Sequence, residues 1–171
     1  TFSGCTGLSG EIPENLFTEY DADGNLVRGI QGGPAYDMFT STFMNCTGLS
    51  GKIPAKLFAG ARGAPAGNMF LRTFQGCTGL TGEIPSTLFA GIKGAPASQM
   101  FYATFYGCSG LTMIPENLFA GVKGKPARAM FVATFQNCTG LSWDIPAALF
   151  AGITGTPAQQ MFDSTFAGCT N

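Results

Sequence analysis

The residues around one cysteine return at nearly constant intervals along this chain of 171 residues. The intervals are 31, 31, 30 and 31 residues, between Cys46, Cys77, Cys108, Cys138 and Cys169. Aligned on the cysteine, each unit reads close to T-F-x-(G/N)-C-(T/S)-G-L-(S/T)-x-x-I-P-x-x-L-F-A-G-x-x-G-x-P-A-x-x-M-F-x-x. Self-similarity at a period of about 20 to 50 residues is the mark of a stacked repeat array. The length therefore counts repeated units rather than domains.

We expect a single array over residues 1–171, with units at about 1–41, 42–72, 73–103, 104–133 and 134–164 and a partial unit at 165–171. The 16 Phe occupy three columns of the repeat, the 10 Pro two columns and the 6 Cys one column. A residue type confined to repeat columns fills a shared core or a shared turn, since a reaction site needs its groups only once.

One unit predicts a short strand or extended turn followed by two helices. Leu80 and Ile84 are apolar positions of the extended part, and Pro85 starts a short helix that a glycine ends. Pro96 opens a longer helix, because apolar or small side chains then recur at i, i+1, i+4, i+5 and i+8, namely Met100, Phe101, Thr104, Phe105 and Cys108. The fold class predicted is an α/β solenoid of about five such units.

The column before the cysteine contains only Gly and Asn: Gly4, Asn45, Gly76, Gly107, Asn137 and Gly168. These residues enter the left-handed region most cheaply, so the column predicts a helix C-terminal cap. The fourth unit has one residue fewer between Leu111 and Ile114 than its neighbours have at the same place, which predicts a bulge or register change there.

Two segments of the unit resemble leucine-rich repeats. The stretch Leu80-Thr81-Gly82-Glu83-Ile84-Pro85 looks like the L-x-G-x-I-P stretch of plant-type repeats, and residues 105–115 resemble the A-F-x-x-C-x-x-L-T-x-I-x-I-P of BspA-type bacterial surface repeats. The resemblance implies a strand row with helices opposite and, for the bacterial family, cell-surface attachment and protein binding. The unit here is about 31 residues long where those families use about 23 or 24.

The six cysteines predict an internal ladder of free thiols, since identical columns of stacked units are usually buried and Cys is among the most buried residue types. Disulfides between neighbouring units and a metal site remain alternatives. The predicted ladder consists of Cys5, Cys46, Cys77, Cys108, Cys138 and Cys169.

The first unit is longer than the others by about ten residues, and the addition contains Asp21, Asp23 and Asn25. Their spacing is similar to the start of a calcium loop, but the twelfth position, where such a loop needs Glu, is Gly32. Asp-Gly-Asn is also well suited to a plain turn. A turn or hairpin is the interpretation, with a weak cation site as its alternative.

The best candidate for a recognition surface is the variable position just before each Ile-Pro pair. Leucine-rich arrays present this row to solvent, and an exposed Trp with Met and mixed charges can anchor a partner. The row consists of Glu11, Lys52, Glu83, Met113, Trp143 and Asp144. Packing of Trp143 across the neighbouring strand is the alternative.

A second column contains Arg62, Lys93 and Lys123. Three charges without exposed aromatic neighbours do not make a nucleic-acid groove. A solvated edge is the interpretation, and an anion-binding stripe its alternative.

The composition argues against catalysis. The chain has no His, no Ser or Cys in a nucleophile setting and no recurring pair of carboxylates, so acid-base and covalent catalysis lack their parts. The net charge of −1 does not by itself point to a polyanionic partner, and no apolar run is long enough to span a bilayer. We expect neither an enzyme nor a cofactor, a nucleic-acid partner or a membrane span.

Two hypotheses for function follow. The first is an extracellular segment that binds a protein or glycan partner at a bacterial cell surface. The second is a structural subunit of an extracellular filament or stalk, in which copies join end to end, because the sequence opens and closes inside the repeat without polar capping units.

Overall fold

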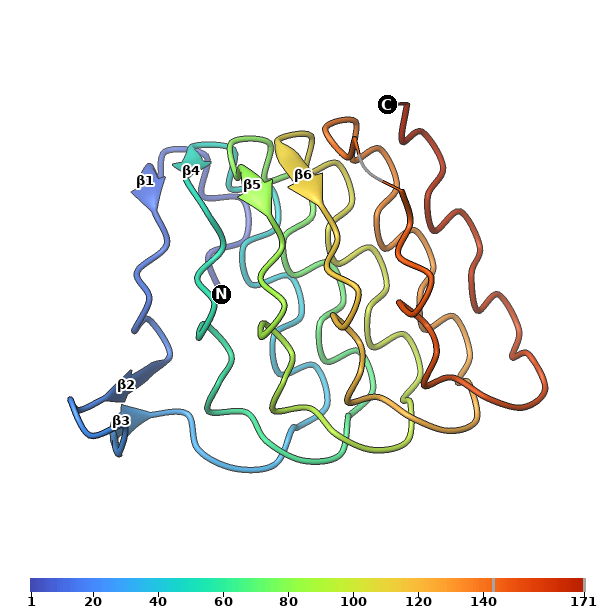
Figure 1. Cartoon of the computed structure of the whole chain (residues 1–171). Coiled ribbons are helices and arrows are strands. Elements are labelled where there is room, and N and C mark those ends of the chain that lie inside the picture. Colours follow the sequence, from blue (N-terminus) through green and yellow to red (C-terminus); the bar gives the residue numbers. More distant parts are fainter. Residues whose placement is uncertain (143, 171) are drawn as a thin grey trace.

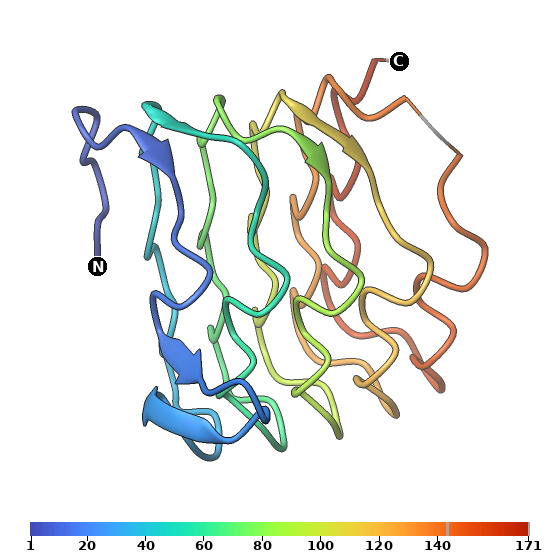
Figure 2. The same cartoon turned by 60° about the vertical axis from the view of Figure 1, so that its left-hand side comes forward.

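The computed structural model describes residues 1–142 and 144–170, and it is a stack of repeated units that lie side by side (Figure 1). Each unit contributes one segment to each of two layers, with the core between them (Figure 2). The described residues contain no helix, so the predicted α/β solenoid with two helices in each unit is wrong. In the same residues, no helix has the length and apolar character needed to cross a membrane.

The strands are short. They are β1 (Gly10–Glu11), β2 (Thr18–Tyr20), β3 (Leu26–Gly29), β4 (Leu49–Ser50), β5 (Gly82–Glu83) and β6 (Leu111–Met113). The pairs β1–β4 and β5–β6 are parallel and join consecutive units, whereas β2–β3 is an antiparallel hairpin within the first unit. Isolated parallel bridges continue the pairing, for example Gly51 with Leu80 and Gly94 with Val122. We call this side of the stack the strand-side layer.

The opposite layer is built from what we call turn ribbons, residues 34–46, 65–77, 96–108, 126–138 and 157–169. In the four ribbons that are followed by another ribbon, the backbone N–H groups alternate between two partners. The amide of Tyr102 donates to the carbonyl of Gln99 three residues earlier (3.1 Å), whereas the amide of Phe101 donates across to Met130 in the next unit (3.0 Å). Such a ribbon is thus a run of tight turns that is bonded to the next ribbon at every second residue.

The turn ribbon explains why a helix was predicted there. Its side chains point inward in pairs at a repeat of four residues, which is close to the 3.6-residue period of a helix. The backbone also enters the left-handed region at every fourth residue, with φ of 53° at Gln99, 50° at Ala103 and 69° at Gly107. A helix cannot accommodate such residues, so the same pattern of burial arises from a different backbone.

The Gly/Asn column before the cysteine is confirmed as left-handed, with φ between 59° and 74° at all six positions. The helix that this column was expected to cap is absent. The column is instead the last of three left-handed positions in each turn ribbon, and the other two accept Ala, Ser, Gln and Arg as well.

The predicted short helix after Pro85 is also wrong. This segment forms successive turns, in which the amides of Leu88, Ala90 and Ile92 each donate to the carbonyl three residues earlier. The glycine expected to stop the helix, Gly91, has another role. A Cβ on Gly91 would collide with the backbone carbonyl of Ala61 in the preceding unit, so glycine is needed for close approach.

All 16 phenylalanines stack in three ladders that run through the core, one for each column of the repeat. Ring centroids of successive units are 5.6 Å apart for Phe74 and Phe105, 5.7 Å for Phe70 and Phe101, and 6.2 Å for Phe58 and Phe89. The first two ladders belong to the turn ribbons and the third to the strand-side layer. Most of these rings are buried, so they supply much of the apolar area removed from water.

The extra residues of the first unit form the hairpin of β2 and β3, which projects from the lower edge of the stack (Figure 1). The predicted register change in the fourth unit is confirmed: β5 and β6 pair Gly82 with Leu111 but Glu83 with Met113, so the register shifts by one residue.

Candidate binding surfaces

The predicted recognition row lies on the strand-side layer. Glu11, Lys52, Glu83 and Asp144 are exposed, and Met113 in β6 is half-buried. Trp143, the remaining member of the predicted row, lies outside the described residues. From the first unit to the fifth, the described residues of the row are therefore an acid, a base, an acid, an apolar side chain and an acid.

The first side chains of this row lie over glycines of the next unit, which leave space for them. The Cγ of Glu11 lies 2.8 Å from where a Cβ would stand on Gly51, and the Cε of Lys52 lies 3.5 Å from the corresponding point on Gly82. The missing Cβ leaves room for the side chain of the preceding unit to lie flat along the stack. The charged groups are therefore carried toward the next unit rather than straight out into solvent.

A hollow of about 170 Å³ lies at the end of the row, next to the register change. Its lining includes Met113, Ile114 and Leu141 from the strand-side layer and Phe166 from the last turn ribbon. Ile145 also lines it and is 55% exposed, which is unusual for a large apolar side chain in a framework of buried ones. Asp144 stands beside it. The hollow offers an apolar contact with a carboxylate at its rim.

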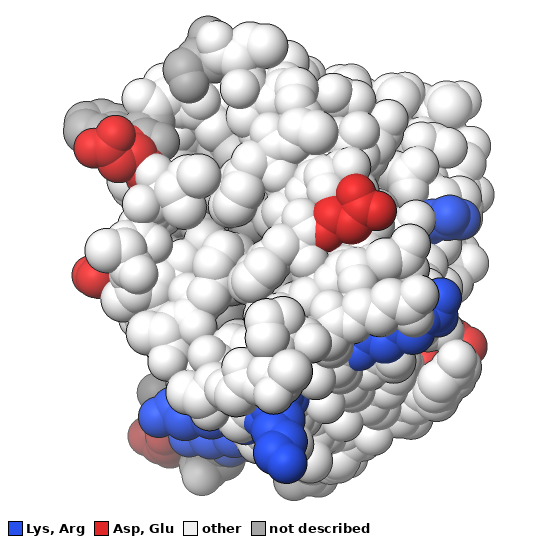
Figure 3. Space-filling model, turned by 90° about the vertical axis from the view of Figure 1, so that its right-hand side faces the viewer, with Lys and Arg blue, Asp and Glu red and all other residues white. Residues whose placement is uncertain are grey.

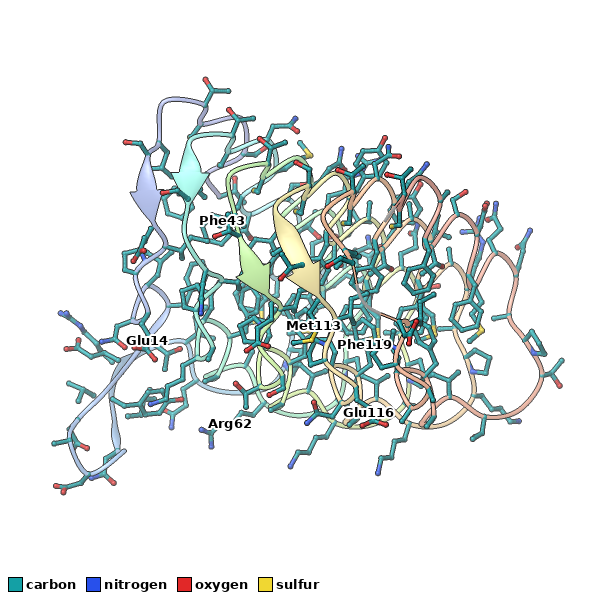
Figure 4. The ribbon with its side chains drawn as sticks, turned by 45° about the horizontal axis from the view of Figure 1, so that its top comes forward. Glu14, Phe43, Arg62, Met113, Glu116 and Phe119 are labelled. Atoms are coloured by element: carbon teal, nitrogen blue, oxygen red, sulfur yellow. The ribbon has the colours of Figure 1, made fainter. Side chains whose placement is uncertain are left out.

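The column of Arg62, Lys93 and Lys123 lies along the lower edge of the stack, where Figure 3 shows much of the positive charge of the viewed face. Figure 4 shows Arg62 and Glu116 pointing outward at this edge, whereas Phe43 and Phe119 lie in the core. Arg62 is oriented by two hydrogen bonds, from its Nε to the carbonyl of Ala59 (3.0 Å) and from its Nη2 to the hydroxyl of Tyr20 (3.4 Å).

Three shallow hollows of about 500, 550 and 600 Å³ follow this column from unit to unit. The first and second share Thr87, Ala90 and Lys93, and the second and third share Asn117, Ala120 and Lys123, so together they form one groove along the stack. We call it the basic groove, and its charged lining residues are Lys56, Arg62, Lys93, Glu116 and Lys123.

All six cysteines are free thiols, and those from Cys46 onward are the last residues of the turn ribbons. The four from Cys46 to Cys138 are buried, whereas Cys169 is half-buried and Cys5, which precedes the first ribbon, is exposed. Each thiol from Cys46 onward donates to the carbonyl of a Phe in the preceding unit, as Cys108 does to Phe74 (3.0 Å). The buried threonines from Thr73 onward do the same for the other ribbon ladder, as Thr104 does to Phe70 (2.8 Å). These two columns supply side-chain donors to carbonyls that the backbone pairing between units leaves available.

Burial sets the ionisation of these thiols. It raises the pKa of Cys77 and of Cys138 to about 12, and it raises the pKa of Cys108 well above its usual value. The thiolate is the reactive form, so these buried cysteines are poor nucleophiles and poor metal ligands near neutral pH. In the described residues, no group of three or more His, Cys, Asp or Glu side chains is arranged to hold a metal ion.

The acidic loop of the first unit is the turn of the β2–β3 hairpin. The Oδ1 of Asp21 accepts from the amides of Asp23 (3.0 Å) and Asn25 (2.8 Å), and its Oδ2 accepts from the Asn25 side chain (3.2 Å). The hydrogen bonds from Asn25 lower the pKa of Asp21. The carboxylate that would lead a calcium loop is thus used to close the turn.

Sequence reasoning identified the column of Arg62, Lys93 and Lys123, with an anion-binding stripe as the alternative to a solvated edge, but it found neither the groove that this column lines nor the hollow at Ile145. The groove floor had a signal in the alanine that follows the Leu-Phe pair of every unit after the first, at Ala59, Ala90, Ala120 and Ala151, because this small residue leaves a depression once the units stack. Ile145 is the Ile of the Ile-Pro pair in the last full unit. The equivalent isoleucines of the other units are buried, so no feature of the sequence indicated that Ile145 is exposed.

Comparison with protein-family models, with curated proteins and with solved structures finds no match to this chain. The leucine-rich-repeat resemblance therefore rests on the quoted residues alone. The helices that it implied opposite the strand row are absent from the described residues.

Proposed function

We propose that this chain is a non-enzymatic binding array that holds a protein partner on the strand-side row, outside the cell. The observation that carries the proposal is that, within each unit, the recurring residues and the variable residues differ in burial. Residues that recur in every unit are mostly buried in the ladders, whereas the variable residues Glu11, Lys52, Glu83 and Asp144 are gathered on one exposed row.

The chemistry of the row favours a protein surface as the partner. Its alternating charges suit salt bridges at the rim of an interface, and the hollow at Met113 and Ile145 suits one apolar anchor. The absence of His from the sequence and the raised pKa values of the buried thiols support a role other than catalysis. The extracellular location is supported by the BspA-type resemblance of residues 105–115.

The proposal is tested by binding of purified, labelled chain to bacterial and host cell-surface proteins separated on a blot or array. Ile145→Glu and Met113→Glu place a carboxylate in the apolar hollow, and we expect each to abolish binding to the recognised protein. Val27→Glu is the matched control, because Val27 is exposed on the hairpin, away from the row.

Binding that survives both hollow variants, or that Val27→Glu abolishes equally, would contradict the proposal. End-to-end assembly stays a prediction. Sedimentation velocity of the same sample over a concentration series checks it, and a single concentration-independent species would rule it out for this chain.

A further inference from the structure

The basic groove carries an excess of positive charge that is not balanced by acidic side chains among the described lining residues. Its first two hollows contain Lys56, Arg62, Lys93 and Lys123 and no acidic residue, and Glu116 is the single acid of the third. Among the described residues, none of these cations forms an ion pair; the pair that does form joins Arg28 to Glu19 in the hairpin.

The cations of the central column stand on consecutive rungs. The amide of Lys93 donates to the carbonyl of Gly63 and the amide of Lys123 to that of Gly94, both at 2.8 Å. Parallel bridges pair Gly63 with Ile92 and Gly94 with Val122, so each cation lies one unit further along the stack than the one before it. Like charges on neighbouring strands repel each other. A ligand with negative groups along a line would relieve this repulsion at several rungs together.

The stems of these side chains are held in the same direction. Their Cγ atoms lie 3.3, 3.4 and 3.2 Å from where a Cβ would stand on the glycines of the following unit, for Arg62 over Gly91, Lys93 over Gly121 and Lys123 over Gly152. Each stem thus crosses the next unit along the stack axis. Binding a ligand would then cost less side-chain entropy than it costs with free lysines.

The remaining lining residues indicate the kind of anion. The floor is formed by small side chains such as Ala59, Ala90 and Ala120, and Ser86 and Asn117 supply neutral hydrogen-bonding groups. The lining contains one aromatic residue, Phe89, whose ring is buried in the core. Single-stranded nucleic acids need aromatic platforms for base stacking, which the groove does not offer. Sugar hydroxyls and carboxylate or sulfate groups match what it does offer.

We propose that the basic groove binds a linear anionic polysaccharide, carboxylated or sulfated, that runs along the stack axis. This surface is distinct from the strand-side row, so the chain has two binding faces. The polymer contacts the cations of several units at once, and its affinity therefore falls steeply as salt is added.

The test measures binding of fluorescent dextran sulfate by anisotropy at about 50 mM salt, where electrostatic binding is strong. Neutral dextran of the same length is the reference ligand, and we expect it not to bind. The double variant Lys93→Gln/Lys123→Gln is expected to weaken dextran sulfate binding about tenfold, since two exposed ion pairs are lost. Arg72→Gln/Arg128→Gln removes the same charge from exposed positions of the turn ribbons, away from the groove, and should leave the affinity unchanged.

Glu116→Gln provides a gain that misfolding cannot imitate, since it removes the one repulsive charge of the groove and should tighten binding about twofold. Equal losses in the two double variants would overturn the proposal, because net charge alone would then explain binding. So would a failure to distinguish dextran sulfate from dextran. Tighter binding of oligo-dT, lost in Lys93→Gln/Lys123→Gln, would assign the groove to nucleic acid instead.

Discussion

The two layers of the stack join neighbouring units to different degrees. Between the turn ribbons 96–108 and 126–138, five backbone hydrogen bonds cross from one unit to the next. Four side-chain bonds, donated by Ser98, Thr134, Asn137 and Cys138, cross as well. Between the strand-side segments of the same two units, three backbone bonds cross within the described residues. The ribbon layer is the framework, and the strand-side layer is left freer to vary its residues and to carry the binding surfaces.

The largest difference between the layers is expected above pH 9, because buried thiols gather in the ribbons. The unfolded chain ionises near the usual thiol pKa of 9.0, whereas burial raises the pKa of Cys77 and Cys138 to about 12. Their contribution to stability is therefore complete below pH 9 and is lost as pH rises toward 12. Each thiol lowers the free energy of unfolding by about 1.4 kcal/mol per pH unit in that window.

Urea titrations between pH 8 and pH 11 measure this slope, and Cys138→Ser should reduce it by the contribution of one thiol. Parent and variant with the same slope would show that Cys138 is not buried as described.

Removing one ring from a ribbon ladder should cost nearly as much. Phe101 is fully buried between Phe70 and Phe131, so Phe101→Ala is expected to lower the free energy of unfolding by about 3–5 kcal/mol. Ile145→Ala, at the exposed hollow of the strand-side layer, should cost less than about 1 kcal/mol. Denaturant unfolding followed by circular dichroism compares the two, and similar losses would remove the distinction between framework and surface.

Substitutions at two glycines distinguish the two reasons for which this fold needs glycine, namely close approach of neighbouring backbones and a left-handed backbone conformation. In the strand-side layer, a Cβ on Gly121 would collide with the carbonyl of Ile92, so Gly121→Ala must shift the backbone and should cost about 3 kcal/mol. In the ribbon layer, Gly107 has a φ of 69° and its nearest atoms are 3.9 Å from the Cβ position, so Gly107→Ala should cost about 1–2 kcal/mol. Thermal unfolding ranks them, and the reverse order would argue against the stacking at Gly121.

The threonine column sharpens the comparison further. Thr104→Val keeps the shape but removes the donor to the Phe70 carbonyl, and we expect a loss of about 1–2 kcal/mol. Thr112→Val, at an exposed strand-side position, should change stability by no more than about 0.5 kcal/mol. Equal values in chemical denaturation would mean that the buried hydroxyl makes no net contribution.

The smallest effect is expected to be stabilising. The Thr18 hydroxyl is buried and has no hydrogen-bond partner among the described residues. Thr18→Val removes this unpaired group at nearly constant shape, so the free energy of unfolding should rise by up to about 1 kcal/mol. A higher melting temperature is the expected readout, and a lower one would reveal a partner for the hydroxyl.

The sequence determined the core but not the backbone that encloses it. The Phe columns predict the buried ladders, the Gly/Asn column predicts left-handed residues, and the missing residue before Ile114 predicts the register change. The helices were wrong because burial at every fourth residue is compatible with a helix and with stacked turns. What decides between them is the bonding of Phe101 to Met130 in another unit, together with left-handed Gln99 and Ala103, which residue preferences do not indicate.

The candidate surfaces divide in the same way. The exposed positions of the row, such as Glu83 and Asp144, follow from the variable column beside the Ile-Pro pair. The shape of the basic groove depends on the spacing between successive units and on which side chains of one unit lie over the glycines of the next. Neither property can be predicted from the sequence of a single unit.

The alternating bonding of the turn ribbon is tested most directly by the hydrogen-bond partner of the Phe101 amide. Scalar coupling across hydrogen bonds, measured by NMR on labelled protein, identifies the carbonyl that accepts each amide proton. The account predicts a coupling from Phe101 to the carbonyl of Met130, and from Tyr102 to that of Gln99. A coupling from Phe101 to the carbonyl of Ala97, four residues earlier as in a helix, would contradict it.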